Sequence, residues 1–104
     1  MSEMKKLLLK TKKVMTQYLK EFPEVRVNRD YFPFKLTEEW GECIQTYLML
    51  TGRGRLKGKT KTEIGHDLAD EMADVLGFLL LFADNEKINL VKALEKKWFK
   101  RLKK

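Results

Sequence analysis

The sequence predicts an all-α protein with a four-helix-bundle-like architecture, and three observations lead to this prediction. Apolar residues recur at steps of three and four over four separate stretches, which is the period of amphipathic helices. No stretch alternates apolar and polar residues as a half-buried strand would. Turn residues separate the four stretches by short connections. The 104 residues are few enough for one domain, residues 1–104.

The first predicted helix covers about residues 3–22. Its apolar stripe is formed by Met4, Leu8, Thr11, Met15, Tyr18 and Phe22, with lysines between them. Pro23 ends this helix because proline cannot continue the hydrogen-bond pattern. The segment from Pro23 to Phe34 has no clear period and contains a second proline, so we expect a loop there.

The second predicted helix covers about residues 34–51. Its stripe is formed by Leu36, Trp40, Cys43, Tyr47 and Leu50, and Gly52 is placed to stop it. We expect Trp40 and Cys43 to pack in the core, so Cys43 is not interpreted as a nucleophile. The sequence GRGRLKGKTK that follows predicts a flexible basic loop with three glycines.

The third and fourth predicted helices cover about residues 62–85 and 90–102. Thr60 and Glu63 fit a capping box, and Asn89 is a plausible N-cap. The third stripe is formed by Leu68, Met72, Val75, Leu79 and Phe82, and the fourth by Val91, Leu94, Trp98 and Leu102 facing inward. Residues 75–83 are apolar on all sides of the predicted helix. Their apolar surface is larger than the other helices of one small chain can easily cover. We therefore expect at least a dimer, with the third helix near the interface.

Composition points to a globular protein of a reducing compartment. The sequence is 43% hydrophobic and 36% charged, which is not typical of disorder. Its single cysteine cannot form an internal disulfide. No secretory signal is visible, and the longest apolar run of nine residues is far below the ~20 that span a bilayer. We expect a cytoplasmic protein without a membrane partner.

The net charge of +7 is unevenly distributed. Residues 36–86 contain ten acidic and five basic residues, for a net charge of −5, and the rest of the chain carries +12. A protein whose acidic residues gather in the middle of the chain is not expected to serve only to bind nucleic acid. The basic ends can still attract polyanions, including nucleotides.

The most informative pattern is a pair of acidic spacings on the second and third predicted helices. The spacings are Glu39 with Glu42, and Glu71 with Asp74. A three-residue step places both side chains on one face of a helix. Two such faces turned toward each other form a cluster of four carboxylates, whose repulsion a divalent cation with oxygen ligands would compensate. The sequence therefore predicts a Mg²⁺ site, with Mn²⁺ as a possible substitute.

The alternative interpretation is a solvated acidic surface. Surface helices usually mix acidic residues with lysines at a spacing of four, but residues 62–86 contain no Lys or Arg. Glu71 and Asp74 also flank the apolar residues Met72 and Val75, at the edge of the predicted core face. Both observations favour a metal site over a solvated face.

At these residues the chain resembles the MazG-type all-α nucleoside triphosphate pyrophosphohydrolases. The stretch EEWGE at residues 38–42 is similar to the family's EEVGE. The stretch from Glu71 to Asp84 is similar to its ELADVLIYLLRLAD, and INLVKAL at residues 88–94 is similar to the entry into its last helix. The resemblance covers roughly residues 33–95.

The resemblance implies a bundle that forms homodimers, or homotetramers as dimers of dimers. It implies Mg²⁺ held by the four carboxylates, and water attacking the α–β linkage to give a nucleoside monophosphate and pyrophosphate. The family commonly carries a lysine and an asparagine on its last helix, whereas here Lys97 stands at the asparagine position. Lys96 or Lys97 is therefore expected to bind phosphate.

Other residues receive roles by hypothesis. Glu38 or Asp70, or a motif carboxylate left free by the metal, would orient or deprotonate water. Asp67 shares the face of Glu71, and His66 is expected at the surface. The alternating loop bases would clamp the triphosphate: Arg53, Arg55, Lys57, Lys59 and Lys61.

Two alternatives remain open. A non-catalytic basic helical module would bind nucleic acid or other polyanions through its lysine-rich ends and the basic loop. Within the enzyme class, the alternative is phosphoribosyl-ATP cleavage. That branch usually has Tyr-His after the second acidic motif, whereas Gly77-Phe78 follow Val75-Leu76 here, which argues against it.

Overall fold

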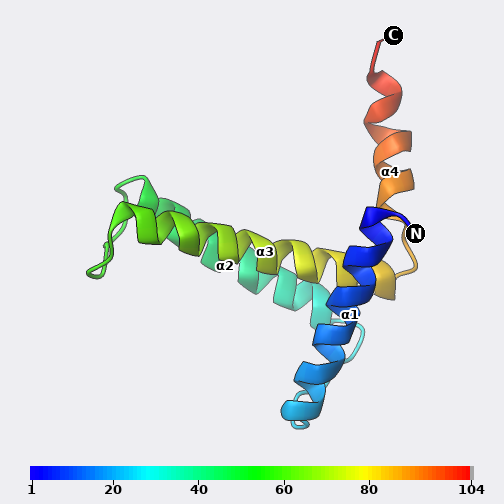
Figure 1. The fold of residues 1–104 in the computed structure, drawn as a ribbon, viewed down its shortest axis with the longest axis horizontal. Helices are drawn as coiled ribbons and strands as arrows, with labels where there is room; N and C mark the ends of the chain where they lie inside the picture. Colours follow the sequence, from blue (N-terminus) through cyan, green and yellow to red (C-terminus); the bar gives the residue numbers. More distant parts are fainter. Residues whose placement is uncertain (104) are drawn as a thin grey trace.

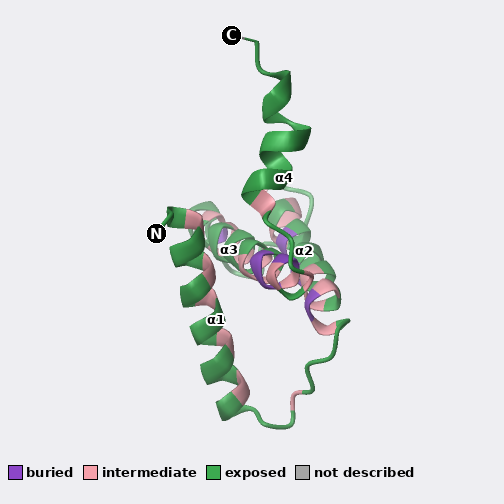
Figure 2. Cartoon of the chain, turned by 90° about the vertical axis from the view of Figure 1, so that its right-hand side faces the viewer, coloured by how far each residue is buried: buried purple, intermediate pink, exposed green. Residues whose placement is uncertain are grey.

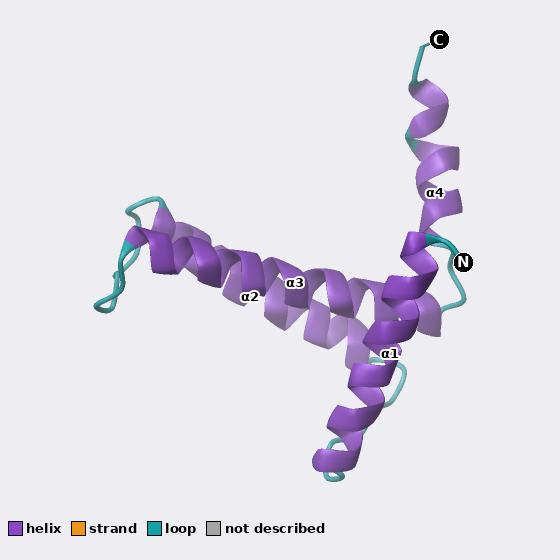
Figure 3. Cartoon of the chain, in the orientation of Figure 1, coloured by secondary structure: helices purple, strands orange, loops and turns teal. Residues whose placement is uncertain are grey.

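The computed structural model describes residues 1–103 and is built from helices and loops (Figure 3). The helices are α1 (Glu3–Glu21), α2 (Tyr31–Leu50), α3 (Lys61–Asn85) and α4 (Leu90–Lys97), and a 3₁₀ turn, η1 (Phe99–Arg101), follows α4. No strand occurs in these 103 residues, which confirms the all-α prediction. None of the helices in this range combines the length and the apolar character needed to cross a bilayer.

The centre of the molecule is a long antiparallel hairpin of α2 and α3 (Figure 1). α1 crosses the C-terminal half of α3, where a Cβ added to Gly77 would lie 3.9 Å from Cγ2 of Thr11. α4 leaves the end of α3 and points away from the hairpin (Figure 1). The chain is therefore a hairpin with one helix packed across it and one helix projecting from it.

The single chain does not close into a four-helix bundle. Its radius of gyration is 16.6 Å, compared with about 13 Å for a compact domain of this length. Figure 2 shows α4 exposed almost throughout, and the predicted inward-facing residues Val91, Leu94, Trp98 and Leu102 are all exposed. The prediction that they pack inward is wrong for the chain alone, because a periodic pattern identifies an apolar face but not the molecule that covers it.

The helix ends follow local chemistry. The Thr60 side chain accepts a hydrogen bond from the backbone N–H of Glu63, and the Glu63 carboxylate accepts one from the backbone N–H of Thr60, which confirms the capping box. The Asn89 side chain caps α4 by accepting a hydrogen bond from the N–H of Lys92. Gly52, with a φ of 77°, follows the end of α2 as predicted.

Two predicted boundaries need correction. α2 begins at Tyr31, three residues before the predicted start, because Pro33 lies in the first turn, where a backbone N–H has no intrahelical partner to lose. α4 ends at Lys97 and continues only as the η1 turn, so the predicted helix to residue 102 is too long.

The buried core lies between α2, α3 and α1. Its apolar members are Phe32, Cys43, Ile64, Leu80, Leu81 and Ala83. Cys43 is buried as predicted, but Trp40 is 54% exposed, and Met72 and Leu79 are exposed as well. Those core assignments are wrong for the single chain. Met72 and Leu79 lie on a side of α3 that faces neither α1 nor α2, and Trp40 lies on a side of α2 that no helix covers.

Leu81 offers a test of this core. Its side chain is 6% exposed, so Leu81→Ala should lower the free energy of unfolding by about 3 kcal/mol through lost burial and a residual cavity. Val14→Ala is the matched control, because Val14 is 64% exposed and should cost less than about 0.5 kcal/mol. Urea unfolding followed by circular dichroism measures both, and equal costs would contradict this description of the core.

Candidate metal centre

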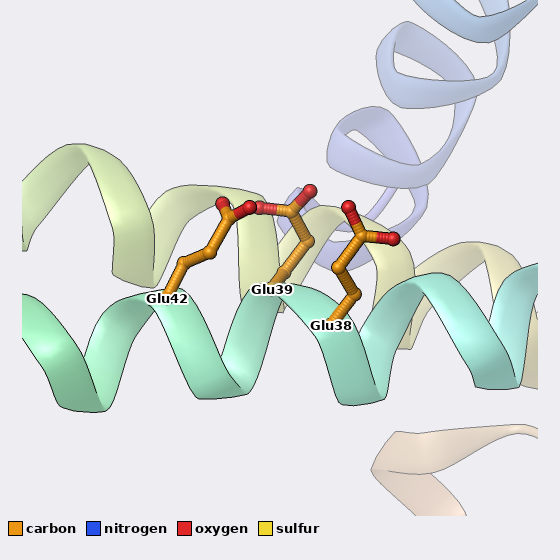
Figure 4. A group of neighbouring side chains, drawn as sticks. All are labelled: Glu38, Glu39 and Glu42. Atoms are coloured by element: carbon orange, nitrogen blue, oxygen red, sulfur yellow. The ribbon is translucent and has the colours of Figure 1, made fainter.

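α2 presents three carboxylates on one side of the helix (Figure 4). One oxygen each from Glu38, Glu39 and Glu42 lies within 4.8 Å of the other two. The three-residue step from Glu39 to Glu42 and the four-residue step from Glu38 to Glu42 bring these side chains onto adjacent turns. Figure 4 shows the carboxylates of Glu39 and Glu42 directed toward each other.

α3 brings two further carboxylates to the same place. Oxygens of Glu71 and Asp74 lie within 4.8 Å of each other and of an oxygen of Glu39. Since α2 and α3 are antiparallel, their acidic steps meet across the hairpin. The structure thus brings together the four residues predicted as metal ligands in two overlapping groups, with Glu39 belonging to both.

Burial and mutual repulsion disfavour the charged forms of these groups. Glu39 is 9% exposed, and its burial, together with the charge and hydrogen bond of Glu42 and the charge of Asp74, raises its pKa to about 7. Burial also raises the pKa of Glu71, and the charges of Glu42 and Asp74 act in the same direction. Without a cation, Glu39 and Glu71 therefore keep their protons to a higher pH than ordinary carboxylic acids do.

One atom of the cluster lacks any partner. Oε2 of Glu71 is buried and receives no hydrogen bond from the protein. A buried carboxylate oxygen without a hydrogen-bond donor is energetically costly. A hard divalent cation coordinated by this oxygen would remove that cost. The donor set, made only of carboxylate oxygens, fits Mg²⁺ or Mn²⁺ rather than a metal that prefers sulfur or imidazole.

The structure adds one basic residue that the sequence reasoning missed. Nζ of Lys35 lies 3.3 Å from Oε1 of Glu38 and 3.7 Å from Oε1 of Glu39. Its burial opposes the charged form, but the hydrogen bond and charge of Glu38 outweigh this, so the pKa of Lys35 is raised. The spacings of three and four residues on one helix were a signal that could have revealed these pairs. One lysine does not neutralise the cluster, because the pKa of Glu39 stays raised beside it.

A groove of about 760 Å³ lies on one side of the carboxylates. Its acidic wall includes Glu42, Asp67, Asp70 and Glu71, and its basic wall is formed by Arg53, Arg55, Lys57 and Lys59 from the loop after α2. The loop is held in place by Lys59, whose Nζ lies 2.6 Å from Oδ2 of Asp67. The structure thus places four of the five predicted loop bases, all except Lys61, beside the predicted metal ligands.

A second cavity, of about 470 Å³, lies on the other side of the carboxylates. Glu39, Asp74 and Lys35 form its polar edge, and its apolar lining includes Met15, Tyr18, Tyr31 and Phe78. These residues come from α1, α2 and α3, so the cavity depends on how α1 crosses the hairpin. No short-range pattern in the sequence could have predicted it.

Some predicted residues lie away from the cluster. Lys96 and Lys97 are exposed on α4, which points away from the hairpin (Figure 1), and neither lines the two cavities beside the carboxylates. The prediction that they bind phosphate is therefore not supported within one chain. Trp40 also lines neither cavity, and His66 is exposed as predicted.

Mg²⁺ should stabilise the folded protein, because only the assembled cluster binds it well. At a Mg²⁺ concentration a hundred times the dissociation constant, the free energy of unfolding should rise by about 2.7 kcal/mol. The melting temperature should rise with it. Glu71→Gln should remove this gain while leaving the metal-free protein no less stable, since a repelling charge is lost. Glu24→Gln, an exposed acid in the loop before α2, is the matched control. An equal Mg²⁺ response in all three proteins would contradict the metal centre.

The raised pKa of Glu39 predicts a pH-dependent stability in chelator. A carboxyl group whose pKa rises on folding binds protons more tightly in the folded state, so its contribution is full below about pH 4.5 and is lost as pH rises through about 7. The free energy of unfolding should fall by about 3 kcal/mol across this window. Glu39→Gln should flatten the slope in chemical denaturation, and a slope unchanged by this variant would contradict the assignment.

Comparison of the chain with protein-family models, with curated proteins and with solved structures finds no match to any of them. The resemblance to MazG-type pyrophosphohydrolases is therefore neither supported nor refuted by relatives. The case for a function consequently depends on the residues of the cluster and of the two cavities beside it.

Proposed function

We propose that this protein is a Mg²⁺-dependent nucleoside triphosphate pyrophosphohydrolase of the MazG type, acting on ribo- or deoxyribonucleotides. The observation that carries the proposal is the convergence of Glu39, Glu71 and Asp74 next to a groove that is also lined by four bases of the loop after α2. Carboxylates alone would repel a triphosphate, and bases alone would bind any polyanion. Together they suit a substrate that carries several phosphates and a divalent cation.

Different residues of the chain would hold the metal and the phosphates. Glu39, Glu42, Glu71 and Asp74 would hold the metal, which when bound would supply charge neutralisation for the phosphate oxygens. Arg53 and Arg55 would hold the outer phosphates in the groove through charge-assisted hydrogen bonds. The Arg53 side chain is already oriented, because its Nε donates a hydrogen bond to Oγ1 of Thr51 and its guanidinium lies 5.5 Å from the ring centroid of Tyr47.

Water would be the nucleophile of the reaction. Its oxygen forms a bond to one phosphorus of the α–β linkage while the bridging P–O bond breaks, which gives a nucleoside monophosphate and pyrophosphate. Asp70 is the better placed of the two predicted bases, because it lines the groove with Glu71, whereas Glu38 is paired with Lys35. A carboxylate in hydrogen-bond reach of the water would take its proton.

The nucleoside would occupy the opposite cavity. The volume of about 470 Å³ lies in the usual range for small-molecule sites. Tyr18, Tyr31 and Phe78 offer aromatic surfaces for a base. Because Glu39 and Asp74 stand at the edge of this cavity and Glu42 and Glu71 at the edge of the groove, a nucleotide would cross the carboxylates between them.

The proposal includes a homodimer or homotetramer in the cytoplasm. The small core and the exposed apolar residues of α2, α3 and α4 support self-association, and Cys43 is buried and free, as suits a reducing compartment. The second candidate is a basic module that binds nucleic acid or other polyanions. The exposed lysines of α1 and α4 favour it, and binding unaffected by chelator would distinguish it from the enzyme.

Kinetics should separate the carboxylates from the loop bases. Asp74→Asn should lower kcat at least 100-fold with a smaller change in KM, because a metal ligand acts mainly on the transition state. Arg53→Ala with Arg55→Ala should mainly raise KM, by about 10-fold or more, and added salt should weaken substrate binding in the same direction. Pyrophosphate release from a panel of standard and modified nucleoside triphosphates measures both.

Arg26→Ala is the matched control for the loop variants, because Arg26 is an exposed base that lines neither cavity. It should leave both constants near those of the unsubstituted protein. If the unsubstituted protein releases no pyrophosphate from any nucleoside triphosphate with Mg²⁺ or Mn²⁺, the proposal is wrong and the polyanion-binding module replaces it.

A further inference from the structure

Among the described residues, Lys35 is the one base that lines the cavity with the aromatic rings. The four loop bases line the groove on the other side of the carboxylates and do not line this cavity. Lys35 lies on α2 four residues before Glu39, so the two side chains project from adjacent turns of one helix face. The cavity side of the carboxylates therefore has a single positive charge of its own.

The ammonium group of Lys35 is held by weak contacts. Its Nζ lies 3.3 and 3.4 Å from the two oxygens of Glu38 and 3.7 Å from Oε1 of Glu39. These distances are long for charge-assisted hydrogen bonds, which are about 2.7–2.9 Å. Nζ also lies 5.8 Å from the ring centroid of Phe78, at the wall of the cavity. Because the Glu38 side chain is 55% exposed, the pair contributes little to stability, and another anion can replace Glu38 at small cost.

A phosphate on the cavity side of the carboxylates would need a positive partner. When ionised, Glu39, Glu71 and Asp74 carry a charge of −3, and a divalent cation with its +2 leaves −1. This remaining charge repels an anion unless another cation is near. The loop bases lie in the groove on the other side. Lys35 carries its charge at neutral pH and stands on the side where the partner is needed.

We infer that Lys35 binds the α-phosphate of the nucleotide, exchanging its partner Glu38 for a phosphate oxygen. The inference rests on the proposed function, in which the outer phosphates lie in the groove and the nucleoside lies in the aromatic cavity. The α-phosphate joins these two parts, so it lies at the carboxylates on the side of the cavity. Lys35 thereby makes the site favour phosphates that carry a nucleoside over inorganic polyphosphates, which would fill the groove alone.

Lys35→Met tests the inference, because methionine keeps the apolar length of the side chain beside Phe78 and removes the charge. Isothermal titration calorimetry with Mg²⁺ present measures two probes. One is inorganic pyrophosphate, and the other is the tightest-binding of the monophosphates of adenosine, guanosine, cytidine, uridine and thymidine. The dissociation constant of the monophosphate should rise about tenfold or more, because a hydrogen bond between two charged groups is lost. Pyrophosphate binding should stay nearly unchanged.

Titration of Lys35→Met with Mg²⁺ alone shows whether the carboxylate cluster is intact. Mg²⁺ should bind this variant as tightly as the unsubstituted protein or more tightly, because a positive charge beside the carboxylates is gone. A role of Lys35 in holding the cluster together would instead weaken the binding of Mg²⁺ and of both probes. That result would overturn the inference.

Lys12→Met is the matched control, because Lys12 is also ion-paired, 3.2 Å from Oδ2 of Asp84, but lines neither cavity. It should leave the binding of both probes unchanged. Arg53→Ala with Arg55→Ala should give the reverse of Lys35→Met, with weaker pyrophosphate binding and little change for the monophosphate.

Three results would overturn the inference: both probes weakened equally in Lys35→Met, neither weakened, or no monophosphate bound by the unsubstituted protein. Failure of the proposed function gives a different result. If monophosphate binding depends on Lys35 but no nucleoside triphosphate releases pyrophosphate, the hydrolase is wrong and Lys35 remains a nucleotide-binding residue.

Discussion

The main physical constraint on the structure is the repulsion among the carboxylates where α2 contacts α3. Packing two helices through Glu39, Glu71 and Asp74 works against folding, because each charge loses water and gains like-charged neighbours. Apolar side chains at the same contact could have served the fold better. Carboxylates at a buried position that costs stability are typical of functional sites, so these three residues mark the candidate site.

The arrangement around the cluster separates two kinds of recognition. The loop after α2 places bases on one side, and the crossing of α1 places aromatic rings on the other. Each side alone is common on protein surfaces. Because they lie on opposite sides of one carboxylate cluster, the site has a charged end and an aromatic end. The nucleotide proposed as substrate has both characters, whereas a simple anion has only one.

Features fixed by nearby residues were predictable from the sequence. The capping box of Thr60 and Glu63 and the cap at Asn89 depend on residues three positions apart, and the acidic steps on α2 and α3 follow from helical geometry. The packing of α4 and the exposure of Trp40 were not predictable, because periodicity does not say which chain covers a face. The predicted start of α2 is three residues late because proline in a sequence indicates a loop, although a first helical turn accepts it.

The ion pair between Lys59 and Asp67 has a consequence for how the groove would fill. Both side chains are partly exposed to solvent, so the pair contributes little to stability. An arriving phosphate would compete with Asp67 for Lys59 and exchange one ion pair for another. The exchange would leave the Asp67 carboxylate, which is already charged in the ion pair, unpaired beside Asp70 and Glu71. An anion bound by the loop bases would in this way strengthen the attraction of the acidic residues for a cation.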